Sequence, residues 1–253
     1  MLWVRNFFWD GRAKGLEDQA KFPLNDPHEM GSYLNEAVKE LQKAKEYPPL
    51  FRQAFGTAEI TADRITKAIA QFERTLISAN SNYDKYLKGE YKPSKQELNG
   101  MELFMNSPQP EKNIRGANCA QCHGTPKMYM ELFHNNGLDT EPKDIGREEL
   151  TGMPNDRGRF RVATLRNIAL TAPYMHDGRF KTLEEVVDHY NEHINSSKTL
   201  SISLKDRSNV INGKNLGLTA SEKLDVISFL KMLTDSTFIN DPKFSDPHLK
   251  RNN

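Results

Sequence analysis

Residues 119–123 read Cys119-Ala120-Gln121-Cys122-His123 and contain both cysteines of this 253-residue chain. Two thiols three positions apart lie along one side of a tight helical turn, and the next residue brings an imidazole beside them. A dithiol redox pair uses C-x-x-C alone, whereas a zinc site needs two further ligands at recognisable spacing. The added histidine separates the cases, because C-x-x-C-H is the attachment signature of c-type haem.

The spacing of the two cysteines and the histidine suits the attachment of a haem. Each thiol can form a thioether to one haem vinyl group, and His123 then lies under the iron as the proximal ligand. Gly124 follows, and its missing side chain leaves room at a crowded haem edge. We therefore expect one covalent haem c at Cys119, Cys122 and His123.

Haem c is attached on the outer side of the bacterial inner membrane, so the motif predicts a periplasmic or otherwise exported protein. The opening residues, Met1-Leu2-Trp3-Val4-Arg5, show no basic region followed by an apolar region and a cleavage site. We interpret this disagreement as the sign of a mature or truncated chain.

The composition is that of an ordinary globular protein, with 37% hydrophobic and 27% charged residues and a net charge of +1. This balance gives no reason to expect nucleic acid or an anionic membrane as a partner. No run of about 18 apolar residues occurs, so we expect no membrane span. The length allows one large domain or two small ones.

The hydrophobic periodicity predicts an all-α fold: cytochrome c-like helical domains with long loops and little strand. Capping boxes, in which a Ser or Thr is followed three positions later by Glu, predict helix starts at Ser94, Thr182 and Thr219. The segment from Thr61 to Ile77 shows a helical face, and the helix from Thr219 shows another. The first face is Ile65, Ala68, Ile69, Phe72 and Leu76, and the second is Leu224, Ile227 and Leu230.

Two proline-containing segments, Ser107 to Ile114 and Asp139 to Asn155, are predicted to be loops. A domain boundary is predicted near residue 92. Residues 93–253 have the layout of a cytochrome c domain, whereas residues 1–92 contain no haem motif.

The second face of a haem iron needs a ligand unless it is an open reaction site. In the helix after Thr182, Tyr190 continues the inward stripe of Leu183, Val186 and Val187, whereas His189 is rotated away from it. A buried tyrosine needs a partner for its hydroxyl, which iron, a propionate or the backbone can supply. Met175, in a proline-stiffened loop, is the second candidate, because thioethers are common axial ligands.

Several blocks together show that the chain resembles the bacterial di-haem cytochrome c peroxidases and their MauG-like relatives. The resemblance covers nearly the whole chain. Besides Cys119–His123, the matching blocks are Phe8–Ala13, Leu16–Ala20, Pro23, Glu29–Met30, Phe72–Leu76, Tyr83–Gly89, Phe160–Asn167, Ala172–Tyr174, His176–Gly178 and Leu183–Val187.

The resemblance implies that residues 1–92 are the remainder of the N-terminal, peroxidatic domain. It also implies that residues 93–253 are the C-terminal domain, which carries the electron-transfer haem. A second C-x-x-C-H motif does not occur in this sequence. We therefore expect either a piece of a longer protein, in which a second haem is present, or loss of the peroxidatic haem.

The resemblance also implies roles for individual residues. Trp9 matches a tryptophan between the two haems that conducts electrons. Gln19, Pro23 and Glu29 match residues over the open face of the peroxidatic haem, where Glu29 would move a proton between the peroxide oxygens.

Two further positions complete the implied site. Thr171 and Pro173 match backbone ligands of a Ca²⁺ ion between the haems. The peroxidases place a methionine at the position of Tyr190, whereas MauG-like proteins place a tyrosine there. The resemblance therefore favours Tyr190 as the axial ligand, with Met175 as the alternative. A phenolate ligand stabilises ferric iron and suits oxidation chemistry.

Three functions follow as expectations. The first is reduction of hydrogen peroxide to water with electrons from a small donor protein, a cytochrome c or a cupredoxin. The second is MauG-like, peroxide-dependent oxidation of a protein or small substrate. The third is a mono-haem electron-transfer module without peroxide turnover, which the single motif supports but which leaves Trp9, Gln19 and Glu29 without a haem to serve. The resemblance further implies a homodimer.

Overall fold

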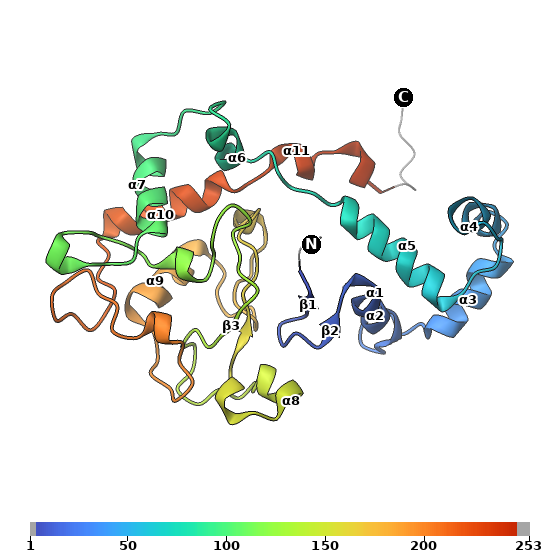
Figure 1. The fold of residues 1–253 in the computed structure, drawn as a ribbon, viewed down its shortest axis with the longest axis horizontal. Helices are drawn as coiled ribbons and strands as arrows, with labels where there is room; N and C mark the ends of the chain where they lie inside the picture. The colour runs from blue at the N-terminus through green and yellow to red at the C-terminus, as the bar shows by residue number, and fades with distance from the viewer. Residues whose placement is uncertain (1–3, 247–253) are drawn as a thin grey trace. The chain divides into compact units, whose positions relative to one another are not determined.

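The computed structural model describes residues 4–246, so Met1, Leu2 and Trp3 at the start of the chain lie outside it, as do residues 247–253. Helices dominate the described residues, and the named strands form two small antiparallel sheets (Figure 1). The all-α prediction is therefore confirmed. The chain divides into two compact units, Met1–Ile77 and Ser78–Asn253.

The first unit begins with a short hairpin, in which Phe7 pairs with Ala13, and continues as five helices. Its core consists of two separate small clusters, one around Phe7 and Leu16 and one around Phe51 and Ile60. Its elements are β1 (Asn6–Phe7), β2 (Ala13–Lys14), α1 (Leu16–Gln19), α2 (Lys21–Asn25), α3 (Leu34–Lys43), α4 (Tyr47–Phe55) and α5 (Ala62–Thr75).

Helix α5 corresponds to the helix predicted over residues 61–77. The Thr61 side chain caps it by accepting a hydrogen bond from the Arg64 amide. The buried residues are Ile65, Thr66 and Ala70, whereas Phe72 is 53% exposed. The buried face is thus rotated from the predicted one, because α5 packs against both α1 and α3.

The second unit contains the C-x-x-C-H motif and most of the irregular structure. All three predicted capping boxes are confirmed, at Ser94, Thr182 and Thr219. The α-helices are α6 (Asn82–Leu87), α7 (Lys95–Met105), α8 (Arg147–Thr151), α9 (Leu183–Glu192), α10 (Ala220–Met232) and α11 (Ser236–Ile239). The short 3₁₀ helices are η1 (Pro110–Lys112), η2 (Cys119–Gln121), η3 (Pro154–Asp156), η4 (Ile168–Leu170), η5 (Ile202–Leu204) and η6 (Pro242–Phe244), and the strands are β3 (Phe133–His134) and β4 (Phe160–Arg161).

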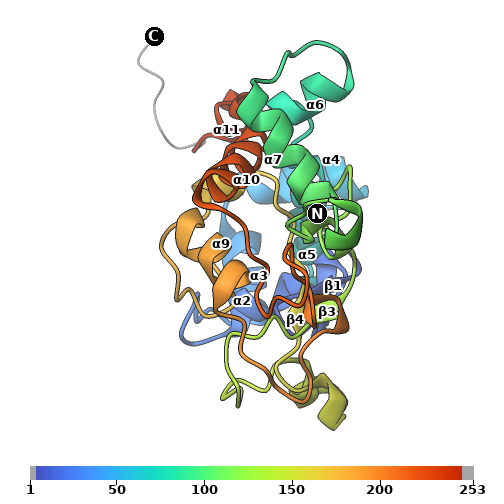
Figure 2. The same ribbon diagram turned by 90° about the vertical axis from the view of Figure 1, so that its left-hand side faces the viewer.

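The core of this unit forms where α7 crosses α10, as Figures 1 and 2 show. A Cβ atom on Gly100 would lie 1.8 Å from the carbonyl oxygen of Asp225, so only glycine allows the two backbones to approach this closely. Beside this contact the rings of Phe104 and Phe229 pack with centroids 5.0 Å apart. Leu183 and Val187 of α9 join the same cluster.

Residues 78–92 pack with the second unit. Tyr83 is 3% exposed, and its ring meets that of Phe229 edge-on at 5.4 Å. Asp84 accepts two hydrogen bonds from the Arg166 guanidinium, at 2.7 and 2.8 Å. The division between the compact units lies between Ile77 and Ser78. The boundary predicted near residue 92 separates two cytochrome c-like domains, and it stays a prediction.

The predicted loops contain local order. The segment from Asp139 to Asn155 includes the short helix α8, whose sequence has too few apolar residues to show a period. The segment from Ser107 to Ile114 closes as a bridge between Gln109 and Ile114 around η1. Among the described residues, no helix is both long enough and apolar enough to cross a bilayer.

Candidate haem site

The C-x-x-C-H motif forms the single turn that its spacing predicts. The amides of Cys122 and His123 donate to the Cys119 carbonyl, at 3.1 and 2.9 Å. Asn118, in the left-handed conformation with φ 61°, turns the chain into η2. The Asn118 side chain donates to the Ser203 carbonyl and accepts from the Ser107 hydroxyl, at 2.6 and 2.7 Å. The turn is thus anchored from both sides.

Both cysteines are unpaired thiols in partly buried positions. Burial raises the pKa of the Cys119 thiol to about 12 and also raises that of Cys122. Among residues 4–246, no group of three or more His, Cys, Asp and Glu side chains could hold a metal ion. A zinc site is therefore unsupported there, whereas neutral sulfurs in an apolar setting suit thioether bonds.

His123 has the protonation state that a metal ligand needs. Burial lowers the pKa of its imidazole to about 4, although the nearby carbonyl groups of Met128 and Ala163 act in the opposite direction. Its Nδ1 atom is buried and has no hydrogen-bond partner among the described residues. A neutral imidazole with an unsatisfied nitrogen, beside two thiols, fits a c-type haem as its donor set.

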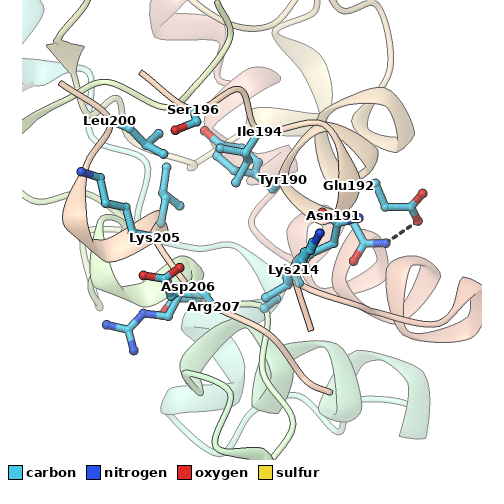
Figure 3. Close-up of a pocket in the computed structure, with 15 residues that line it drawn as sticks. Tyr190, Asn191, Glu192, Ile194, Ser196, Leu200, Lys205, Asp206, Arg207 and Lys214 are labelled. Carbon is cyan, nitrogen blue, oxygen red and sulfur yellow. Dashed lines mark hydrogen bonds between the residues drawn. The ribbon is translucent and has the colours of Figure 1, made fainter. Parts of the chain in front are cut away.

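A pocket of about 320 Å³ lies next to this turn (Figure 3). Ala117 and Asn118 from the motif side and Tyr190 and Asn191 of α9 form part of its wall. The remaining wall comes from the loop that follows α9 and from the last residue of that helix. These residues are Glu192, Ile194, Ser196, Leu200, Leu204, Lys205, Asp206, Arg207, Lys214, Asn215 and Leu216.

The two candidate axial ligands meet at one amide group. Asn136 Nδ2 lies 3.3 Å from the Tyr190 hydroxyl oxygen and 3.4 Å from the Met175 sulfur. Burial raises the pKa of Tyr190 to about 12, while the Asn136 hydrogen bond lowers it. Tyr190 lines the pocket, whereas Met175 does not appear in its wall. The choice between the two ligands stays a prediction.

The prediction that His189 is rotated away from the core is wrong. His189 is 3% exposed, and its Nε2 atom lies 3.0 Å from the Asn136 carbonyl oxygen. Its ring also packs near Phe180, with centroids 5.6 Å apart. The inward stripe of α9 is therefore wider than its apolar residues indicate. Sequence reasoning also missed Asn136, because the run Asn135-Asn136-Gly137 is typical of a turn and gives no sign of a contact with Tyr190.

The residues predicted to act at the peroxidatic haem all lie in the first unit. Trp9 is 42% exposed, Gln19 ends α1, and Glu29 is exposed in a turn after α2. The Met30 amide donates to the Pro23 carbonyl at 3.1 Å, which holds that turn against α2. Their roles stay predictions.

The predicted calcium ligands lie on an exposed loop of the second unit. Thr171 follows η4, and its hydroxyl donates to the Ile168 carbonyl at 3.2 Å. Within the described part of the chain, no hydrogen bond is donated to the backbone carbonyl of Thr171 or Pro173. Both oxygens are thus available to a cation, and the calcium site stays a prediction.

Comparisons with known proteins identify the family of this chain. The sequence model of the family "Di-haem cytochrome c peroxidase" matches residues 1–92. Cytochrome c551 peroxidase of Nitrosomonas europaea is 42% identical over 186 residues, which cover 72% of this chain and 53% of that protein. The methylamine utilization protein MauG of Methylophilus methylotrophus is 34% identical over 237 residues, covering 91% of this chain and 64% of that protein.

A solved structure extends the likeness to the fold. The crystal structure of a MauG-like protein associated with microbial copper homeostasis superposes with a TM-score of 0.83 at 34% identity. The match covers 97% of this chain and 76% of that one. The chain thus spans only part of the length of the relatives that it matches, about half in the case of the Nitrosomonas protein. It belongs to the family of di-haem cytochrome c peroxidases and MauG proteins.

Proposed function

We propose that this chain provides the electron-transfer haem of a peroxide-reducing oxidoreductase. Electrons from a small redox protein would enter at a haem c held by Cys119, Cys122 and His123. They would then reduce hydrogen peroxide to water, with two electrons and two protons consumed for each peroxide. The observation that carries this proposal is the turn in which the Cys122 and His123 amides donate to the Cys119 carbonyl, which brings together two thiols and an imidazole whose buried Nδ1 atom has no hydrogen-bond partner among the described residues.

Different residues of the second unit would hold different parts of the haem. Cys119 and Cys122 would bind it covalently, and His123 would donate a nitrogen to its iron. When bound, a haem c supplies one-electron redox chemistry at a potential set by its axial ligands and surroundings. Cys119 and Ala120 of the turn pack against the buried core of α7, α9 and α10.

The first unit would supply the peroxidatic part of the site. We assign residues 1–92 to the peroxidatic domain and residues 93–253 to the electron-transfer domain. Glu29 would take a proton from one peroxide oxygen and deliver it to the other, which assists cleavage of the O–O bond. Gln19 would bind the peroxide, and Trp9 would carry electrons between the haems.

MauG-like oxidation is the second candidate. Here peroxide withdraws two electrons from a protein or small substrate and is itself reduced to water. Two observations favour this branch: the pocket-lining Tyr190 and the 34% identity to a MauG-like crystal structure. A phenolate ligand stabilises ferric iron, which suits an enzyme that oxidises its substrate.

The same proposal implies a cell compartment and partners. Haem c attachment would place the protein in the periplasm or another exported location. The donor would be a cytochrome c or a cupredoxin, Ca²⁺ would bind at Thr171 and Pro173, and the chain would form a homodimer.

The first test measures haem content and the axial ligand. The chain is exported together with haem c maturation machinery, and bound haem is counted by the pyridine haemochrome method. One haem per chain is expected, with a ferric absorption spectrum that changes in Tyr190→Phe. Tyr91→Phe is the matched control, because Tyr91 bonds Glu97 in the same unit, away from the motif. No covalent haem in the wild type contradicts the proposal.

The second test separates the functions. Consumption of hydrogen peroxide is followed with a reduced cytochrome c or cupredoxin as the donor. Glu29→Gln is expected to lower kcat by about 10²–10⁴-fold while the haem content stays the same. If a fully loaded wild type consumes no peroxide with either a donor or an oxidisable substrate, the protein is a mono-haem electron-transfer module.

A further inference from the structure

One asparagine touches both candidate axial ligands. Asn136 follows β3, and its Nδ2 atom lies 3.3 Å from the Tyr190 hydroxyl oxygen and 3.4 Å from the Met175 sulfur. A primary amide has two N–H donors, so it can serve both acceptors at once. This side chain contacts each residue that could close the second face of the iron.

The backbone on both sides of Asn136 is fixed. The preceding Asn135 is 2% exposed, and its side chain donates to the hydroxyls of Ser197 and Thr199, at 3.2 and 2.9 Å. The following Gly137 has φ 74°, and its amide donates to Asn135 Oδ1 at 2.9 Å. A Cβ atom on Gly137 would lie 2.6 Å from Ile194. The amide of Asn136 therefore extends from a rigid segment.

A third contact ties this segment to the helix that carries Tyr190. His189, next to Tyr190 on α9, has its Nε2 atom 3.0 Å from the Asn136 carbonyl oxygen. The side chain of Asn136 reaches Tyr190, while its backbone holds His189. Because two bonds join the same two segments, the distance from the amide to the tyrosine oxygen is fixed by structure outside the pocket.

The two acceptors respond differently to an N–H donor. A thioether sulfur accepts hydrogen bonds weakly, whereas a hydrogen bond to a charged oxygen is about twice as strong as a neutral one. A bond donated to a phenolate draws electron density away from it and weakens its donation to iron, which raises the reduction potential. The Tyr190 oxygen is therefore the strong acceptor of the Asn136 amide, and the Met175 sulfur is the weak one.

We infer that Asn136 is a positioning residue that fixes the Tyr190 oxygen as a ligand for the haem iron and raises the iron's reduction potential through its hydrogen bond to that oxygen. This inference rests on the proposed function, because it requires haem c at Cys119, Cys122 and His123. The inference says that Asn136 changes the reduction potential of the haem although it does not bind the iron.

The test is a double-mutant cycle on the haem-loaded protein. The reduction potential and the ferric absorption spectrum are measured for wild type, Asn136→Leu, Tyr190→Phe and the double variant. Asn136→Leu is expected to lower the potential and alter the ferric spectrum. In the Tyr190→Phe background the same substitution is expected to have no effect on the potential. Asn99→Leu, at an exposed position on α7, is the matched control.

A second substitution covers the case in which Asn136→Leu does not fold. Asn136→Asp has nearly the same shape but offers no N–H donor, and it is expected to lower the potential as well. An unchanged potential and spectrum in haem-loaded Asn136→Leu or Asn136→Asp overturns the inference alone. An equal effect with and without the Tyr190 hydroxyl also overturns it. A wild type without covalent haem overturns the proposed function and this inference together.

Discussion

The two compact units differ in how they bury their side chains. The large cluster around Phe104 and Phe229 fills the second unit, whereas the first unit has two small clusters. Of the largest fully buried side chains described, Thr66 is in the first unit and the rest are in the second. Opening free energies follow local burial, so we expect the second unit to be the more stable one.

The candidate chemistry follows the same division. His123, Cys119 and Tyr190 lie in partly buried positions that shift their pKa values. By contrast, Trp9 is 42% exposed and Glu29 is exposed. The candidate residues with shifted pKa values therefore lie in the second unit, whereas the exposed candidates lie in the first.

The largest expected effect is the loss of covalent haem. Cys119→Ala would remove one of the two proposed thioether bonds and is expected to reduce haem content to a small fraction of the wild-type value, measured by pyridine haemochrome on the purified chain. Glu29→Gln, in the first unit, should leave haem content unchanged. An equal loss of haem in Cys119→Ala and Glu29→Gln would show that haem attachment depends on both units. It would contradict the assignment of the attachment site to the second unit alone.

The next effect concerns the core of the second unit. Phe229→Ala removes a side chain with no exposed surface and is expected to lower the free energy of unfolding by about 3–5 kcal/mol. Phe72→Ala removes a side chain that is 53% exposed in the first unit and should change it by less than about 0.5 kcal/mol. Urea unfolding followed by circular dichroism measures both values. A similar loss in the two variants would contradict the burial argument.

Asp235 makes the stability of the second unit depend on pH. Burial raises the pKa of this carboxyl, but bonds from Thr237, Asn80, Phe238 and Ser78 outweigh it and lower the pKa from 3.8 to about 2. Because the folded pKa is depressed, the stabilisation is complete above pH 3.8 and is lost as the pH falls toward 2.

Asp235→Asn is therefore expected to cost about 2 kcal/mol at neutral pH and less as the pH falls. Urea unfolding between pH 2 and pH 6 measures the difference from the wild type. Asp241→Asn, which changes a more exposed cap near the same end of the chain, is the control. If the difference in free energy of unfolding between Asp235→Asn and the wild type stayed constant over this range, the hydrogen bonds to Asp235 would not depend on the charge of its carboxyl group.

The smallest effect lies in the first unit. Thr61→Ala removes the cap of α5, in which the hydroxyl accepts from the Arg64 amide at 3.3 Å, and should cost about 1 kcal/mol. Hydrogen exchange of α5 amides measures it. Faster exchange confined to residues 62–75 is expected, whereas faster exchange in α7 and α10 as well would show that the two units unfold together.

Local signals in the sequence predicted local structure well. The capping boxes at Ser94, Thr182 and Thr219 involve residues three apart, so their geometry needs nothing from the rest of the chain. The turn from Cys119 to His123 is local for the same reason. Tyr190 came from the helical period of α9, whereas family resemblance supplied Trp9, Gln19, Glu29, Thr171 and Pro173, which no periodicity in this sequence could have identified.

The failures all involve partners distant in the sequence. His189 is polar, so the apolar stripe of α9 excluded it, but a carbonyl from residue 136 makes its burial favourable. Phe72 is apolar and fits a helical period, but α5 packs through Ala70 and leaves that ring exposed. Asn136 contacts Tyr190 across 54 positions of sequence. Such contacts depend on tertiary packing, which a pattern of single residues does not encode.

The crossing of α7 and α10 at Gly100 has a consequence for the order of events during synthesis. The haem motif and Tyr190 both lie in the stretch of chain between the two crossing helices. In the exported chain that we propose, Cys119 and Cys122 would emerge before α10, which follows them in the sequence and packs against α7. The thiols would then be accessible to the attachment machinery in an open chain. The contact at Gly100 would form only after α10 has emerged.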